Sequence, residues 1–439
     1  MMSKIINAFP GYEYVIGPDK KAHNMYRGTD VGFGGYVYAQ PGMYSNVALL
    51  DVGNMHGASI LALNKFGENT QRYKEIREAR MAIKARDYDR ASKMLNGVLA
   101  PYLTSDEEAD RLANALKLVL NSTYGIAAAT FANELRDPRD KNNIIALRGA
   151  LFMRTLQDEV AQRGFKVAHI KTDSIKIPNA TQEIIDFCFD FGRKYGYEFE
   201  HECTYERMCL VNNAVYIAKY DEQGIRNKGG KHANEWTATG AQFAVPYIFK
   251  TLFSHEEIEF KDLCETKSTT DASMYLDMNE SLEDVSALEK EYKKRLKAGD
   301  SSDELAGILN QIAAGHRYHF VGKVGMFTPV VPGAGGGVLL SSKDQVKYDA
   351  VTGTKGFRWL ESEMVKDKDL QDKIDMEYFN GLCNDAIKNI EKYGAHDIFI
   401  EADHDTYASY ARSLLDPEFN QYMQSPVEVI DEGEEIPFR

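Results

Sequence analysis

Two carboxylates in the sequence each follow apolar residues that would hold them in a defined place. Asp51 lies at the end of an almost continuous apolar run over residues 46–52, which predicts a buried strand that delivers Asp51 to its edge. Asp173 lies in Lys171-Thr172-Asp173-Ser174, between isoleucine-rich arms, and this pattern predicts a tight β-hairpin over residues 168–177 with the carboxylate at its tip. A lone Asp in a turn is ordinarily only a turn residue. A charge at the end of a buried strand is costly, however, unless it is paired or binds a cation.

A basic helix face lies between these two carboxylates in the sequence. Residues 71–95 are predicted to form a helix pair, or one helix with a break near Asp87. Arg77, Arg80 and Lys84 recur at i, i+3 and i+7 and therefore share one face. Taken alone, such a face is most simply a solvated surface.

A second predicted helix carries its own polar stripe. Residues 105–121 begin with Ser105 and Glu108 as a capping box, and Gly125 is expected to end the helix. Its expected apolar face consists of Leu112, Ala115, Leu116 and Val119. Lys117, Asn121 and Tyr124 recur at i, i+4 and i+7 on a separate face. Two antiparallel helices that each present cations would form a clamp for a polyphosphate.

Composition indicates a globular protein with a local basic surface. The 439 residues are 44% hydrophobic and 27% charged, enough for two or three subdomains, and no apolar run is long enough to suggest a membrane span. Five cysteines without a C-x-x-C pair indicate reduced thiols in a cytosolic protein. The net charge of −14 argues against a DNA-coating protein, although residues 72–93 carry eight Lys or Arg against four acids.

The order of expected elements predicts an α+β fold. Helices are expected over residues 143–163 and 181–195, and strands over 165–178, 197–202 and 207–220, which suits an antiparallel sheet with helices on one face. Beyond residue 234 the expected elements are helical, at residues 243–253, 280–312 with a break at 298–300, and 370–395. An acidic tail follows, with ten acids and two arginines in residues 401–439.

Four segments together resemble the polymerase half of family B (polymerase-α-like) DNA polymerases, particularly phage-encoded ones. Residues 51–60, D-V-G-N-M-H-G-A-S-I, look like the first palm motif of the family, and K-T-D-S at 171–174 resembles the second palm motif, D-T-D-S. Residues 117–125, K-L-V-L-N-S-T-Y-G, fit the fingers motif K-x-x-x-N-S-x-Y-G without a mismatch. Residues 212–216, N-N-A-V-Y, lie where the family has a primer-binding K-K-x-Y element. The match covers roughly residues 30–250.

The resemblance implies a right-hand polymerase architecture with an antiparallel palm, helical fingers and a mostly helical thumb. The expected division is an N-terminal segment and first palm part at 1–66, fingers at 67–124, a second palm part at 125–250, and the thumb with the acidic tail at 251–439. A family member usually carries a 3′–5′ exonuclease before the palm, and only fifty residues precede Asp51 here. We therefore expect proofreading to be absent or supplied by a separate chain that docks near residues 1–45.

The resemblance also implies template-directed DNA synthesis with two Mg²⁺ ions, for which Mn²⁺ would substitute. Asp51, Asp173 and the backbone carbonyl of Val52 would bind the metal ions, and Lys117 would protonate the leaving pyrophosphate. The residues expected to bind the nucleotide are Arg80, Lys84, Lys117, Asn121, Tyr124 and His56. Those expected to contact DNA are Lys171, Thr172, Tyr216, Lys228, Lys231, Gly34 and Gly35. The expected partners are primer-template DNA and dNTPs, in the cytoplasm (of a host cell, if phage-encoded) and not at a membrane.

Several positions depart from the family pattern. Lys171 replaces an Asp, Gly57 replaces a Pro, and Asn212-Asn213 replaces a Lys pair. The loss of the Lys pair should weaken the binding of duplex DNA and its salt dependence. His56 replaces the Tyr that in the family blocks the 2′-hydroxyl of ribonucleotides, and we expect deoxynucleotide selection to persist but to be weaker. These departures motivate an alternative, a polymerase-like DNA-binding or replisome scaffold subunit with weak or no catalysis. Another two-metal enzyme, such as a nuclease, fits less well because it needs no nucleotide-binding fingers.

Overall fold

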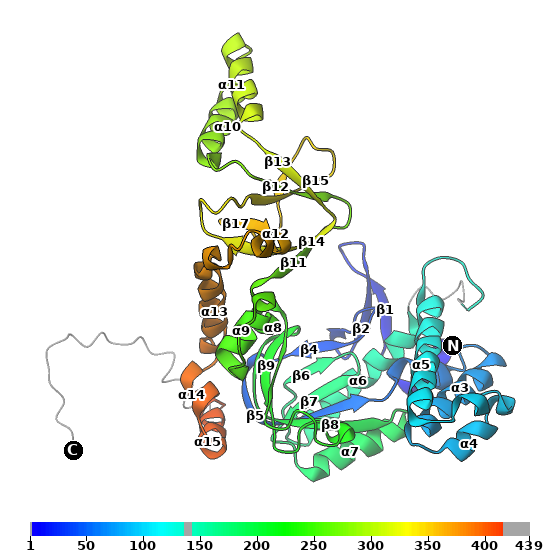
Figure 1. Ribbon diagram of the computed structural model, residues 1–439. Helices are drawn as coiled ribbons and strands as arrows, with labels where there is room; N and C mark the ends of the chain where they lie inside the picture. Colours follow the sequence, from blue (N-terminus) through cyan, green and yellow to red (C-terminus); the bar gives the residue numbers. More distant parts are fainter. Residues whose placement is uncertain (1, 136–142, 416–439) are drawn as a thin grey trace, which may run out of the picture. The chain divides into compact units, whose positions relative to one another are not determined.

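The computed structural model describes residues 2–135 and 143–415, and the chain forms two compact units (Figure 1). The first unit comprises Met1–Ala238 and Ile390–Arg439, and the second comprises Thr239–Asn389. The α+β class expected from the sequence is confirmed. The chain returns to the first unit at Ile390 and packs its last described helix on the sheet of that unit.

A seven-stranded sheet forms the centre of the first unit, in the order β10-β9-β8-β5-β7-β6-β4. Its central strand β5 pairs antiparallel with β7 on one side and with β8 on the other. The strands are β4 (Val37–Ala39), β5 (Gly42–Val52), β6 (His169–Lys171), β7 (Ser174–Pro178), β8 (Phe199–Asn212), β9 (Val215–Tyr220) and β10 (Trp236–Thr239). The predicted hairpin is confirmed, with β6 and β7 joined through Thr172 and Asp173. The two strands predicted at 197–202 and 207–220 have other boundaries: β8 is one long strand that covers the predicted gap, and β9 begins after a turn at residues 213–214.

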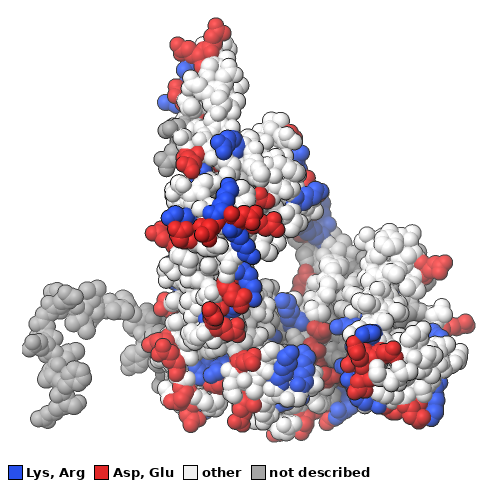
Figure 2. Space-filling model, in the orientation of Figure 1, with Lys and Arg blue, Asp and Glu red and all other residues white. Residues whose placement is uncertain are grey.

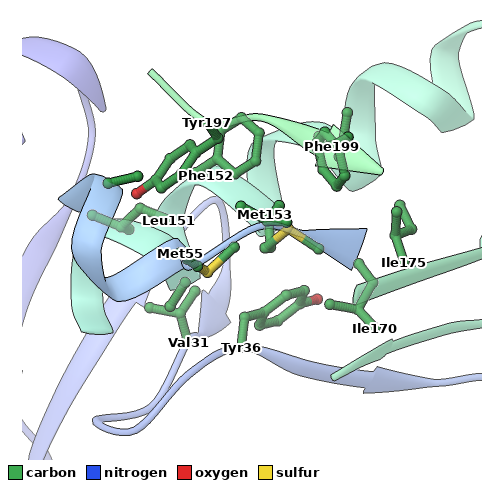
Figure 3. Packing of buried hydrophobic residues seen from close by; sticks show 14 of the residues in the cluster. Val31, Tyr36, Met55, Leu151, Phe152, Met153, Ile170, Ile175, Tyr197 and Phe199 are labelled. Carbon is green, nitrogen blue, oxygen red and sulfur yellow. The ribbon is translucent and has the colours of Figure 1, made fainter. Parts of the chain in front are cut away.

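Alternate residues of the central strands pack against three helices on one face of this sheet. The helices are α2 (Met55–Leu63), α6 (Ile144–Gln162) and α7 (Gln182–Lys194). Figure 3 shows side chains of this core, with Phe152 and Tyr197 on one side and Ile170 and Ile175 on the other. Gly149 of α6 permits close packing on α2, because a Cβ there would lie 2.6 Å from the sulfur of Met55. This packing holds the end of β5, and therefore Asp51, in place.

A separate helical group contains α3 (Asn69–Lys84), α4 (Tyr88–Lys93) and α5 (Asp106–Ala128). The predicted break near Asp87 is confirmed, and the Asp87 side chain accepts a hydrogen bond from the Arg90 N–H as the cap of α4. The predicted end of α5 at Gly125 is wrong, since the helix continues to Ala128 and Gly125 is exposed there.

The apolar face expected on α5 is also partly wrong. Leu112 and Leu116 pack inward, but Ala115 and Val119 are exposed. The fully buried positions of α5 are Ala109, Ala113, Leu120 and Ala127. Alanines on both helices allow α3 and α5 to approach closely. The face of α5 that is buried against α3 therefore centres on these alanines and not on the larger apolar residues.

Further elements of the first unit lie near its two ends in the sequence. They are α1 (Met2–Ala8), β1 (Glu13–Ile16), β2 (Ala22–Tyr26), β3 (Thr29–Asp30), α14 (His396–Glu401) and α15 (His404–Leu414). Helix α15 packs on β5, and the Tyr407 hydroxyl donates a hydrogen bond to the Tyr44 carbonyl at 3.2 Å. Most of the predicted acidic tail, residues 416–439, lies outside the described residues.

The second unit contains two small sheets beside its helices. It contains a three-stranded sheet, β11-β14-β17, and a four-stranded sheet, β13-β12-β15-β16. The strands are β11 (Glu265–Ser268), β12 (Ser273–Asp277), β13 (Tyr318–Gly322), β14 (Val324–Val330), β15 (Val338–Ser342), β16 (Asp349–Ala350) and β17 (Arg358–Glu361). Most of these strands are only two to five residues long, too short for a clear alternating pattern.

Helices of the second unit follow the sequence pattern more closely. They are α8 (Ala241–Ala244), α9 (Pro246–Phe249), α10 (Leu282–Lys297), α11 (Asp303–Ala314), α12 (Ser362–Asp367) and α13 (Met376–Glu391). The predicted helical stretch at 280–312, with a break at 298–300, is confirmed as α10 and α11. In the described parts of both units, no helix combines the length and apolarity that crossing a membrane requires.

Candidate active site

A cavity of about 340 Å³ in the first unit brings together residues from β5, the β6–β7 hairpin, α3, α5 and the start of β8. Seven of the residues expected to bind metal or nucleotide line it: Asp51, Val52, Arg80, Lys84, Lys117, Asn121 and Asp173. Residues as far apart in the sequence as Asp51 and Glu200 therefore line one cavity. A cavity of this volume is in the range of small-ligand sites.

One wall of the cavity is acidic and rigidly built. The Val52 N–H donates to the Asp173 carbonyl at 2.9 Å, which ties the hairpin tip to the end of β5. In the strand register, Asp51 lies opposite Ser174 on β7 and opposite Glu200 on β8. Glu198 and Glu200 line the same cavity. The wall therefore presents Asp51 and Asp173 with two further carboxylates beside them.

This concentration of carboxylates makes the site suited to a cation. Burial, followed by the nearby charge of Asp173, raises the pKa of Asp51 to about 7. Burial also raises the pKa of Asp173. A divalent cation would offset this repulsion, and oxygen ligands of this kind suit Mg²⁺. Among the described residues, no group of three or more His, Cys, Asp or Glu side chains is arranged to hold a metal.

The hairpin tip is strained, and a glycine makes room for it. Thr172 has φ 59°, which is unusual for a β-branched residue. Its N–H donates to the Tyr36 carbonyl at 2.9 Å. Gly35, at φ 146°, lies directly against the Thr172 side chain, and a Cβ on Gly35 would be 2.9 Å from Thr172 Cγ2. The glycine at position 35 therefore leaves room for Thr172, one residue before Asp173.

We expect Gly35→Ala to lower the free energy of unfolding by about 1–3 kcal/mol, because it combines overpacking with a disallowed φ. Thr172→Gly in the same chain should recover part of the loss, since it removes the side chain that the new Cβ meets. Chemical denaturation of the single and double variants measures this. The matched control is Gly34→Ala, where a Cβ would meet nothing within 4 Å. If Gly35→Ala and Gly34→Ala lose the same stability, the proposed contact is not a constraint.

The opposite wall of the cavity is basic. Helix α3 contributes Arg77, Arg80 and Lys84, and α5 contributes Lys117. The Arg80 Nε donates to the Ala113 carbonyl at 3.2 Å and so joins α3 to α5. The Arg77 guanidinium forms an ion pair with the Glu198 carboxylate at 3.8 Å, and the Arg77 Nε is buried without a hydrogen-bond partner among the described residues. Four cations and four carboxylates therefore line one cavity.

Three of these residues were not among those assigned to the site from the sequence. The helical spacing could have assigned Arg77 to the site, since Arg77 shares the predicted face of Arg80 and Lys84. The sequence could not assign Glu198 and Glu200 to the site, because their position depends on the pairing of β5 with β8, which no local pattern reveals.

His56 and Tyr124 lie beside the cavity and do not line it. Their rings are stacked, with centroids 4.0 Å apart and planes 10° apart. The Tyr124 hydroxyl accepts a hydrogen bond from the Asn143 side chain at 2.9 Å. Burial lowers the pKa of His56, and its Nδ1 is buried without a hydrogen-bond partner among the described residues. The structure thus presents a fixed, neutral imidazole with one unused polar atom.

The residues expected to contact DNA are more dispersed. Lys171 is exposed at the end of β6. Tyr216 is half-buried on the sheet face opposite the helices, with the Lys176 ammonium 5.0 Å from its ring centroid. Lys228 and Lys231 are exposed on the loop after β9. None of these side chains lines the cavity, and neither do Thr172, Gly34 and Gly35.

Comparison with known proteins gives only remote similarity of fold, to solved structures. No family model matches the sequence, and no curated protein matches it. Among solved structures, the chain is similar to the family B DNA polymerase from the hyperthermophilic archaeon Pyrobaculum calidifontis, with 12% sequence identity and a TM-score of 0.41. The similarity covers 90% of this chain and 47% of that chain, so the chain spans about half the length of that polymerase.

Proposed function

We propose that this chain is a DNA-directed DNA polymerase that adds dNTPs to a primer 3′-hydroxyl by two-metal nucleotidyl transfer. The observation that carries the proposal is the cavity with opposed charges, in which carboxylates of β5, the hairpin and β8 face the cations of α3 and α5. A metal-bound triphosphate is complementary in charge to this lining, since the metal ions would bind the carboxylates and the phosphates would pair with the cations. In this proposal the first unit supplies palm and fingers and the second supplies the thumb.

The acidic wall would hold the metal ions. Asp51 and Asp173 are the ligands, and the backbone carbonyl of Val52 is proposed as a third. Bound there, the metal ions would lower the pKa of the primer hydroxyl and offset the charge of the leaving pyrophosphate. Asp51 and Asp173 are half-buried, and the lower local dielectric there would strengthen charge interactions at the reacting phosphate.

The basic wall would bind and orient the triphosphate. Arg77, Arg80 and Lys84 lie along one face of α3, where they can contact successive phosphates. Lys117 on α5 faces the same space and is proposed to give its proton to the leaving pyrophosphate. Asn121, one turn further along α5, would contact the sugar or base of the incoming nucleotide.

Primer extension tests this proposal. Purified protein is given a labelled primer-template, Mg²⁺ and dNTPs, with Asp173→Ala in parallel. We expect the wild type to extend the primer and the variant not to. Tight primer-template binding without extension, in Mg²⁺ or Mn²⁺, would contradict the polymerase and favour a scaffold subunit.

His56 is expected to contribute to sugar selection. The stack on Tyr124 fixes the imidazole beside the cavity, so His56→Ala would open space where a 2′-hydroxyl could fit. We expect the preference for dNTP over rNTP to fall about tenfold in His56→Ala, the scale of a single pocket contact. His56→Tyr should raise the preference above that of the wild type. The ratio of kcat/KM for dATP and ATP measures this, and an unchanged ratio in His56→Ala would show that the ring is not the selecting group.

A further inference from the structure

The four-stranded sheet of the second unit has an aromatic face that is open to solvent. Tyr275 pairs with Phe320 and Asp277 pairs with Tyr318, so these alternate positions share one side of the sheet. Tyr275 is buried, and its ring contacts Phe320, Tyr318 and Tyr348 edge to face. Phe320 is 61% exposed and Tyr318 is 37% exposed. We refer to Tyr318, Phe320 and Tyr348 as the aromatic platform.

Part of this platform is a column of parallel rings. His316 stacks on Tyr318 with planes 11° apart, and Tyr318 stacks on Tyr348 at 4.0 Å with planes 7° apart. Asp277 is fully buried and fixes the column, because it accepts hydrogen bonds from His316 Nδ1 at 2.5 Å and from the Arg317 N–H at 3.0 Å. Rings held in this way lose little side-chain entropy when another flat ring stacks on them.

A stripe of lysines lies next to the platform. Lys290, Lys293, Lys294 and Lys297 recur at i, i+3, i+4 and i+7 of α10, and all four are exposed. Glu289 connects the two features, since it lies 3.7 Å from His316 and 3.8 Å from Lys293. Figure 1 shows α10 and α11 as a helical hairpin that extends from the strands β12 and β13.

Charge on the face of the molecule drawn in Figure 2 is mixed. Figure 2 shows basic and acidic residues interspersed over the drawn face, without one continuous basic surface. The lysine stripe is therefore a local feature of α10. Glu289 and Glu291 border it on either side, and the four lysines lie between them around the helix.

We propose that the aromatic platform and the lysine stripe bind single-stranded nucleic acid. Unpaired bases would stack on Phe320 and Tyr348, and the phosphates would meet the lysines of α10. Stacked rings beside a basic track are what single-strand binding requires, because every base has a flat π-face whereas the phosphates supply the charge. This surface is additional to the cavity of the proposed polymerase, and binding there does not depend on catalysis.

Fluorescence anisotropy of the full chain with a labelled dT16 oligonucleotide tests the stacking. We expect Phe320→Ala with Tyr348→Ala to weaken the Kd about 5–150-fold, the effect of losing one stacked base or more. A blunt duplex of equal length should lose less than twofold affinity, because its bases are already stacked. Tyr102→Ala, an exposed ring in the first unit, is the matched control and should leave the Kd unchanged.

The salt dependence tests the lysines. Replacing Lys290, Lys293, Lys294 and Lys297 by Gln should reduce the slope of log K against log salt by about 3 for the single strand. Replacing Lys355, Lys366, Lys368 and Lys388, which are also exposed in the second unit, is the control with the same change of charge. Melting curves of all variants establish that they fold.

Two results would overturn the proposal. One is an unchanged dT16 affinity in the variant Phe320→Ala with Tyr348→Ala, which would mean that these rings do not bind bases and serve instead as a surface for another protein. The other is an equal loss of single-strand and duplex affinity, which would mean that bases do not stack there. Failure of the wild type to extend a primer would contradict the proposed polymerase and would leave the binding result standing.

Discussion

Arg207→Met is expected to lower the free energy of unfolding of the first unit by about 3–5 kcal/mol, the usual effect of breaking a buried ion pair. Arg207 is 1% exposed on β8 and forms an ion pair with Glu206. Its guanidinium donates to the carbonyls of Phe399 at 2.8 Å and Ala402 at 2.7 Å, at the end of α14. The substitution leaves these two carbonyls without their donor. Glu206, which is nearly buried, would then keep Lys219, at 3.7 Å, as its one cationic partner among the described residues.

Chemical denaturation followed by tryptophan fluorescence measures this loss. Trp236 is a suitable reporter, because its ring lies 5.4 Å from that of Phe399. Arg193→Met is the control, since Arg193 is 61% exposed and such surface pairs contribute less than about 1 kcal/mol. A loss in Arg207→Met that does not exceed the control would mean that the C-terminal helices do not depend on this arginine.

Lys117→Met is expected to lower kcat/KM for dNTP incorporation about 10²–10³-fold, as removal of one group that stabilises the transition state commonly does. Lys117 lines the cavity opposite the carboxylates, whereas the expected DNA-contact residues lie outside it. The primer-template Kd should therefore stay within about twofold of the wild type, because the lost charge faces the nucleotide. Single-nucleotide incorporation at varied dNTP concentration separates the two quantities.

The control for Lys117 is Lys93→Met. Lys93 is exposed on α4, is paired with Asp89 and lies outside the cavity. If Lys117→Met and Lys93→Met have the same kinetics, the polyphosphate clamp is not formed by α5.

Local patterns in the sequence predicted the parts of the site that local chemistry determines. The hairpin around Asp173, the strand that ends at Asp51 and the helix break at Asp87 all depend on turn residues and short apolar runs. The polar stripe of α5 likewise follows from helical spacing, and two of its members, Lys117 and Asn121, line the cavity. The third, Tyr124, stacks on His56 instead.

What the sequence could not predict depends on contacts between distant segments. Glu200 reaches the site only through the pairing of β8 with β5, and the partners of Arg207 lie 192 and 195 positions away. Lys176 is another example, because the alternation Ile175-Lys176-Ile177 is typical of a strand with one solvent-exposed face. In the structure Lys176 is 4% exposed, and its ammonium donates to His169 Nδ1 at 3.2 Å. Tertiary packing decides the environment of such residues.

The measurement that tests the central claim most directly is the stoichiometry of products in a single-turnover reaction. Wild-type protein, a labelled primer-template and one dNTP at a time are mixed with Mg²⁺, and both primer length and released pyrophosphate are followed. We expect one pyrophosphate for each nucleotide added, addition only of the nucleotide complementary to the template, and neither product with Asp51→Asn or Asp173→Asn. A primer that shortens, or one that grows equally well in both variants, would contradict nucleotidyl transfer at this cavity.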